Sequence, residues 1–223
     1  MADFFLSAKK KLDQVGSLIA ALESEIDAFN ATEPHERVVE TDPEGLVQEH
    51  RVRLIRSLPP NLADITLDAA AALHDTLDQS VFAASKIAGS HRLLDTAFPI
   101  ARDSVALDKL MEEKCEGVPP EIAQTIRAQK PYRGANDLIW GIAVIESMAR
   151  KKNALIVPLG SVDSGLTFIN NKTAPEVRWN AQNKEIELGF FPIHGKFHRD
   201  INIYFSAAFG QVDSLEGRPV VLT

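Results

Sequence analysis

The sequence predicts an α+β fold: an N-terminal helical bundle with a β-hairpin insertion, followed by a C-terminal antiparallel β-sheet portion. Three observations predict it. Apolar residues recur at the helical period of three or four positions up to about residue 153. One stretch at about 36–57 alternates on both sides of a turn sequence, and alternation prevails after residue 153. We therefore expect 1–153 to be mainly helical and 154–223 mainly β, packed as one unit or as two.

The first expected helix runs from Phe4 to Phe29, and Pro34 prevents it from continuing. An apolar stripe on one helix face has to be covered, either by the chain's own helices or by a second copy. An amphipathic helix near a terminus is a common dimer element, and we expect a homodimer. The residues of this stripe are Leu12, Val15, Ile19, Leu22, Ile26 and Phe29.

A β-hairpin is predicted around Asp42-Pro43-Glu44-Gly45, which is a type I turn sequence between two alternating segments. A long Ala-rich helix is expected next, with Asn61 or Asp64 as its cap and Gly89 at its end. The face of this helix expected in the core comprises Leu67, Ala70, Leu73, Leu77, Val81 and Ala84.

Three shorter helices are predicted at about 104–114, 119–130 and 137–152. Pro131 ends the second of them, and Asn136 is expected to cap the third. The segments after them that are predicted as strands are "LTFIN", "EVRWNA", "EIELGFF", "DINIYFSAAF" and "PVVL".

The composition is that of a globular protein, with 45% hydrophobic and 25% charged residues. The single cysteine, Cys115, cannot form an internal disulfide, which fits a reducing compartment. No apolar run is long enough to span a bilayer, and the first residues lack the order of a secretory signal. We therefore expect a cytoplasmic protein with no membrane contact. The net charge of −7 opposes nucleic-acid binding except at a local basic patch.

The clearest polar constellation lies in "AALHDTLDQSVFAAS", residues 71–85. His74 and Asp78 are one helical turn apart, so Asp78 could orient His74 as a general base. The same spacing could supply half of a metal site, but no third ligand is evident. We favour an ordinary surface pair that stabilises the helix, and we predict neither a metal nor a cofactor.

A second candidate is a nucleic-acid patch in which aromatic residues lie between cations. Its candidate residues are Lys130, Arg133, Arg150, Lys151 and Lys152, with Tyr132 and Trp140. The net acidity favours instead a core position for Trp140 and solvated charges around it. His194 and His198 have a metal-ligand spacing, but they lie in a Gly-containing turn and not on a helix, so we interpret them as turn surface.

Several segments, in order, resemble one group of bacterial proteins of unknown function. They are "RVRLIRSLPPNL" (51–62), "LDAAAALHDTLDQSV" (67–81), "TAFPI" (96–100), "GVPPEIAQTIRAQKPY" (117–132), "LIWGIAVIESMARKKNAL" (138–155) and "AFGQ…EGRPV" (208–220). In that group the second segment is typically "GDxLHNLRSALDHL", and the fifth is "LWLLxxLxNIDKHR". The Arg and His of the group's helix are similar to the signature of HEPN ribonucleases, all-helical modules that often dimerise through this face.

The chain departs from this resemblance at the residues that would do chemistry. His74 stands where the group has Arg, and Gln79 stands where it has His. A Gln cannot exchange a proton near neutral pH, and a neutral His lacks the guanidinium fork. In the later segment Ser147, Ala149 and Lys151 replace the group's Asn, Asp and His. The resemblance therefore implies that a catalytic site present in the group has been lost here.

We predict a non-catalytic binding or interaction module whose partner is a second copy, another protein or RNA. One alternative is a HEPN-like, metal-independent ribonuclease using His74 and Asp78, with Arg133 or Arg150 against the phosphate. The other is a small-molecule binding protein that uses a cleft between helices and sheet.

Overall fold

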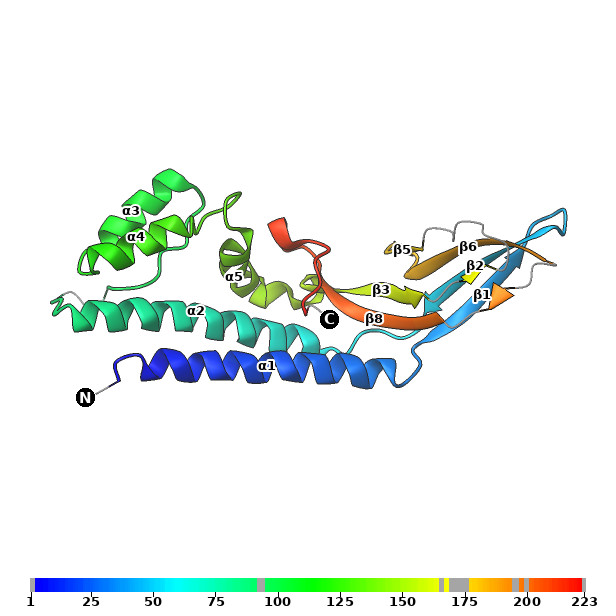
Figure 1. Cartoon of the computed structure of the whole chain (residues 1–223), viewed down its shortest axis with the longest axis horizontal. Coiled ribbons are helices and arrows are strands. Elements are labelled where there is room, and N and C mark those ends of the chain that lie inside the picture. The colour runs from blue at the N-terminus through cyan, green and yellow to red at the C-terminus, as the bar shows by residue number, and fades with distance from the viewer. Residues whose placement is uncertain are drawn as a thin grey trace. The chain divides into compact units, whose positions relative to one another are not determined.

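The computed structural model describes residues 3–91, 95–164, 167–168, 177–193, 197–198 and 201–221. Its elements confirm the predicted α+β class, with helices before residue 155, strands after it and one N-terminal hairpin (Figure 1). The chain divides into two compact units that interleave along the sequence. Unit 1 comprises Met1–Leu22, Pro60–Ile156 and Phe209–Arg218, and unit 2 comprises Glu23–Pro59, Val157–Ala208 and Pro219–Thr223.

The helices of unit 1 follow the predicted order, and the first of them, α1, extends into unit 2. They are α1 (Leu6–Asn30), α2 (Asn61–Ile87), α3 (Ser104–Lys114), α4 (Pro120–Ala128) and α5 (Asp137–Ser147), followed by the short 3₁₀ segments η1 (Met148–Ala154) and η2 (Asp213–Leu215).

The predicted stripe of α1 is only partly buried. Val15, Leu22, Ile26 and Phe29 are in the core, but Leu12 and Ile19 are 55% and 41% exposed. The apolar stripe by which a helix packs on its neighbour spans roughly 100° around the helix axis. Leu12 and Ile19 lie at the margin of that stripe, and the chain's own helices do not cover them. One margin of the apolar face of α1, at Leu12 and Ile19, is therefore uncovered.

The helix ends differ from the predictions in two places. Pro60 occupies the N-cap position of α2 with no side-chain cap, so neither Asn61 nor Asp64 is the cap. The helix predicted over 137–152 ends at Ser147, because the backbone narrows to the 3₁₀ form and Lys151 leaves helical geometry (φ −127°, ψ 37°). The predicted cap of α5 is confirmed, since Asn136 accepts a hydrogen bond from the Ile139 amide at 3.2 Å.

Two apolar clusters fill unit 1. In the first, α2 packs on α5 and η2 through Ala70, Ile145, Met148, Leu155, Val212 and Leu215. In the second, the far end of α2 meets α3 and α4 through Val81, Phe98, Leu107, Met111, Cys115 and Ile126. Helix α2 takes part in both clusters, so it packs against α3 and α4 at one end and against α5 and η2 at the other.

Unit 2 is built on a four-stranded antiparallel sheet in the order β1-β2-β6-β5. Its strands are β1 (His35–Thr41), β2 (Val47–Leu54), β5 (Arg178–Asn180) and β6 (Glu185–Pro192). Two further pairs are β3 (Ile156–Ser164) with β8 (Ile201–Phe209) and β4 (Thr167–Phe168) with β7 (Phe197–His198). Strand β3 was not predicted. The predicted strand "PVVL" is wrong over its described part, Pro219–Val221, which holds only a single bridge from Pro219 to Ala208.

The hairpin turn is confirmed at the predicted residues. The Gly45 amide donates to the Asp42 carbonyl at 3.0 Å, and Gly45 has a φ of +70°, which glycine adopts without strain. The Asp42 carboxylate accepts from the amides of Leu46 and Val47 at 2.7 and 2.9 Å. One acidic side chain therefore fixes the turn and the start of β2.

Candidate functional site

His74 and Asp78 lie on α2 as predicted, but they do not pair with each other. His74 Nδ1 lies 2.7 Å from Oε2 of Glu146 on α5. Asp78 Oδ1 accepts a hydrogen bond from the Phe98 amide at 2.7 Å. Residues one turn apart point to different neighbours here, since His74 faces α5 and Asp78 faces the segment before α3. The expected His74–Asp78 pair is therefore wrong, and Asp78 anchors backbone.

The His74–Glu146 pair is half-buried, with side chains that are 30% and 31% exposed. A carboxylate at Nδ1 favours the tautomer that carries its proton there, which leaves Nε2 as an acceptor. This is how an oriented general base is built. Glu146 was missed because it lies 72 residues from His74 in the chain, and nothing local in the sequence connects them.

Arg133 forms an ion pair with Asp213, a partner that could not be predicted from the sequence. Its Nε and Nη2 lie 2.8 and 3.0 Å from the two carboxylate oxygens of Asp213 in η2. Trp140 is half-buried and donates through Nε1 to the same carboxylate at 3.3 Å. The favoured core position for Trp140 was therefore wrong, because its indole nitrogen reaches a surface carboxylate.

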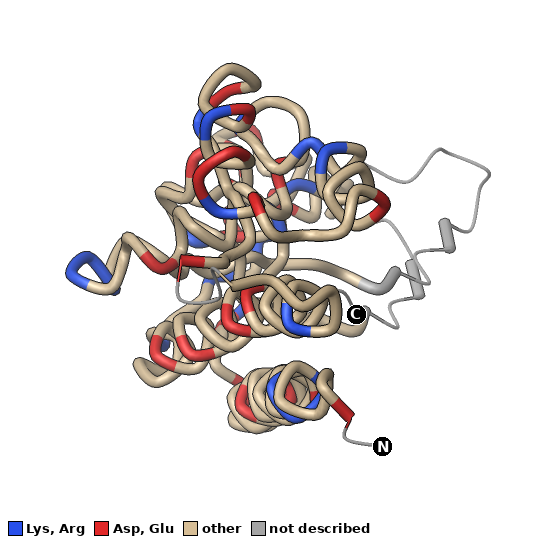
Figure 2. The backbone as a smooth tube through the Cα atoms, turned by 90° about the vertical axis from the view of Figure 1, so that its left-hand side faces the viewer, with Lys and Arg blue, Asp and Glu red and all other residues tan. Residues whose placement is uncertain are grey.

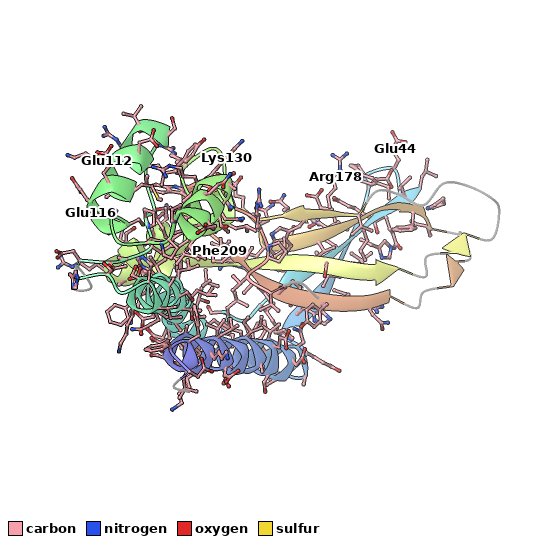
Figure 3. All side chains as sticks on the ribbon, turned by 60° about the vertical axis from the view of Figure 1, so that its left-hand side comes forward. Glu44, Glu112, Glu116, Lys130, Arg178 and Phe209 are labelled. Carbon is pink, nitrogen blue, oxygen red and sulfur yellow. The ribbon has the colours of Figure 1, made fainter. Side chains whose placement is uncertain are left out.

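Lys130 is exposed at the end of α4, where Figure 3 labels it, and has a φ of +48°. Figure 2 shows acidic and basic segments interspersed along the helices. The nucleic-acid patch therefore stays a prediction.

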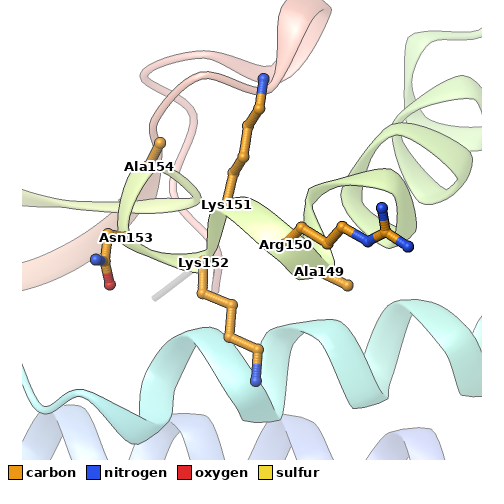
Figure 4. Close-up of a pocket in the computed structure, with 6 residues that line it drawn as sticks. All are labelled: Ala149, Arg150, Lys151, Lys152, Asn153 and Ala154. Atoms are coloured by element: carbon orange, nitrogen blue, oxygen red, sulfur yellow. The ribbon is translucent and has the colours of Figure 1, made fainter.

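Arg150, Lys151 and Lys152 lie together on η1. With Ala149, Asn153 and Ala154 they line an open concavity of about 400 Å³ (Figure 4). Lys152 forms an ion pair with Asp64 in the first turn of α2. The turn is thus a compact basic site within unit 1, and one of its three cations is already neutralised.

The remaining candidates for chemistry are a metal site and the Cys115 thiol. No cluster of three or more His, Cys, Asp or Glu side chains is placed there to hold a metal. His194 and the side chain of His198 lie outside the described residues. Burial raises the pKa of the Cys115 thiol, so it stays protonated near neutral pH.

The comparisons add no assignment: no family model, curated protein or solved structure matches this chain. The resemblance to the bacterial group and to HEPN ribonucleases stays a prediction, as does small-molecule binding. Over the described residues, none of the helices has the length and apolar character needed to cross a bilayer.

Proposed function

We propose that this chain is a non-catalytic binding module that assembles as a homodimer through the uncovered margin of the apolar face of α1. The observation that carries the proposal is the exposure of Leu12 and Ile19 on one side of a long, regular helix. Between them lies Gly16, where an added Cβ would meet nothing within 4 Å. Exposed apolar residues gathered on one face mark an interaction surface.

A second copy of α1 is the occupant that fits this face. In an antiparallel pairing that crosses at Gly16, Leu12 of one copy lies against Ile19 of the other, and the glycine lets the backbones approach closely. Lys9 and Glu23 are each seven residues from Gly16, so they meet as opposite charges across the crossing. The pair of Lys9 with Asp3 is exposed and weak enough to exchange.

We propose that the chain is not a catalyst because the candidate catalytic residues already form hydrogen bonds or ion pairs within the fold. His74, Asp78 and Arg133 each hold a partner within the fold. A ribonuclease of the HEPN kind needs a base and a free cation at one phosphate. Among the described residues, no contact brings His74 to Arg133 or Arg150. We also infer a cytoplasmic location, which a single, buried, unpaired cysteine supports.

The dimer is tested by light scattering coupled to size-exclusion chromatography. We expect the wild type to have twice the mass of one chain. The double variant Leu12→Glu/Ile19→Glu should be a monomer with unchanged far-UV circular dichroism, because buried like charges repel. Gln14→Glu adds a charge at another exposed position of α1 and should stay dimeric. A monomeric wild type, or a double variant that remains dimeric, would contradict the proposal.

The second candidate function is a metal-independent ribonuclease, which the oriented His74–Glu146 pair favours. It predicts cleavage of single-stranded RNA in the presence of a chelator, lost in His74→Ala and reduced in Glu146→Gln. Under the proposal of a non-catalytic module, the wild type leaves the RNA intact. Cleavage that depends on His74 would overturn that proposal and establish the ribonuclease.

A further inference from the structure

The basic turn of η1 is a second candidate binding surface, separate from α1. Arg150, Lys151 and Lys152 follow one another in a chain whose net charge is −7, so their local charge opposes that of the whole molecule. They line a concavity of about 400 Å³, which falls within the range of small-ligand sites. This inference is independent of the proposed dimer.

Two of these three cations are free to bind a ligand. Lys152 points toward α2, where it meets Asp64, while Lys151 extends the opposite way (Figure 4). Within the described part of the chain, no carboxylate lies within ion-pair distance of Arg150 or Lys151, and the Asn153 amide makes no side-chain hydrogen bond. The charge available at the turn therefore belongs to Arg150 and Lys151.

We propose that this turn binds a compact anion of the diphosphate class. A guanidinium presents a planar fork that matches phosphate oxygens, and an ammonium supplies a compact point charge. Arg150 and Lys151 are adjacent in sequence but extend in different directions (Figure 4). Two cations arranged in this way suit two linked anionic groups better than a single phosphate.

The lining of the concavity argues against other ligand classes. Among the described residues, the apolar part of its lining consists of Ala149 and Ala154, which offer little surface to a hydrophobic molecule. Over that same part of the chain, its lining includes no aromatic side chain on which a base could stack. The net charge of −7 also disfavours a long nucleic acid, whose many phosphates would meet acidic surface.

The test is isothermal titration of the full chain with inorganic pyrophosphate, and with a nucleoside diphosphate in a parallel series. Arg150→Gln/Lys151→Gln should weaken binding at least about tenfold, which corresponds to 1.4 kcal/mol. Lys130→Gln/Arg133→Gln removes the same two charges elsewhere and should change affinity by less than about twofold. Tighter binding of the nucleoside diphosphate would support a carried diphosphate, and equal binding would support the free anion.

Several results would overturn the proposal. They are no binding of pyrophosphate by the wild type, equal weakening in both double variants, and citrate binding as tight as pyrophosphate. Tighter binding of an RNA oligonucleotide with a steep salt dependence would assign the turn to nucleic acid instead. The monomeric Leu12→Glu/Ile19→Glu variant should still bind pyrophosphate, so failure of the dimer and failure of the anion site are distinguishable.

Discussion

At the scale of single residues, the Asn30 side chain forms the two backbone hydrogen bonds with Phe205 that a neighbouring strand would otherwise form. Its Nδ2 donates to the Phe205 carbonyl at 2.7 Å, and its Oδ1 accepts from the Phe205 amide at 2.8 Å. The same Nδ2 also lies 2.9 Å from the Ile26 carbonyl, which ties the last turn of α1 to strand β8. The Phe205 side chain is fully buried, so the adjacent backbone groups depend on this amide.

Asn30→Ala should therefore lower the free energy of unfolding by about 2–3 kcal/mol, because the amide and carbonyl of Phe205 lose their partner. Urea denaturation followed by circular dichroism measures the difference. Gln14→Ala, at an exposed position of the same helix, should leave the midpoint unchanged. Equal midpoints for Asn30→Ala and the wild type would show that these hydrogen bonds contribute nothing net.

The ionisation of Tyr204 makes the stability of the protein change with pH in the alkaline range. Burial, and then a hydrogen bond of 3.0 Å to Asp27, raise the pKa of Tyr204 to about 12. The unfolded phenol ionises near its ordinary pKa of 10, so above pH 10 the unfolded state loses its proton first. The stabilising contribution is therefore complete below pH 10 and is lost as the pH rises through about 12.

Denaturation at a series of pH values should show wild-type stability falling between pH 10 and 12, with a smaller fall in Tyr204→Phe. The difference between the two curves isolates the phenol from the lysines that titrate in the same range. Parallel curves for the two proteins would mean that Tyr204 ionises equally in the folded and unfolded states.

At the scale of elements, helices with a regular apolar repeat and turns with a characteristic sequence were predictable. The distant residues that these elements contact in the folded chain were not. The turn at Asp42–Gly45, the cap Asn136 and the long helix α2 all follow from local sequence. The kink at Lys151 is not encoded in apolar spacing, and it lies between Met148 and Leu155, which both belong to one buried cluster of unit 1. The partners Glu146 and Asp213 are likewise set only by folding.

Strand β3 was missed because Pro158 and Gly160 interrupt its apolar pattern. The structure explains the glycine. A Cβ at Gly160 would lie 2.6 Å from the ring of Trp179 on β5 and 2.7 Å from Ile186 on β6. The absence of a side chain lets β3 approach these strands closely, so a residue that argues against a strand in the sequence is required by the packing of this one.

Gly160→Ala should consequently destabilise the protein by about 1–3 kcal/mol, the usual range for overpacking a core. Thermal unfolding measures the effect, and a change in Trp fluorescence would report the displaced Trp179. The control substitution Gln182→Ala changes an exposed position in the turn between β5 and β6 and should not lower the melting temperature. A Gly160→Ala protein as stable as the wild type would show that Trp179 and Ile186 can shift at no cost.

At the scale of the whole molecule, the two units interleave, so neither is a continuous stretch of sequence. After the strands of unit 2, the chain returns to unit 1 through Phe209–Arg218. There the amides of Gly210 and Gln211 donate to the carbonyls of Leu155 and Ala154 at 2.8 and 2.9 Å. The change from helix to strand near residue 155 therefore falls beside one boundary between the units, at 156/157, but unit 2 also contains the N-terminal hairpin and unit 1 also contains the segment Phe209–Arg218.

This return segment completes the core of unit 1 through Leu215. Leu215 is 3% exposed, belongs to the cluster of Ala70 and Ile145, and lies where a Cβ on Gly141 would be 2.3 Å from it. Leu215→Ala should cost about 2–5 kcal/mol, because the close approach of α5 leaves a cavity that little can fill. Urea denaturation measures it, and Leu138→Ala on α5, a residue 67% exposed, should have little effect. If both variants unfold at the same midpoint as the wild type, unit 1 does not depend on the return of the chain.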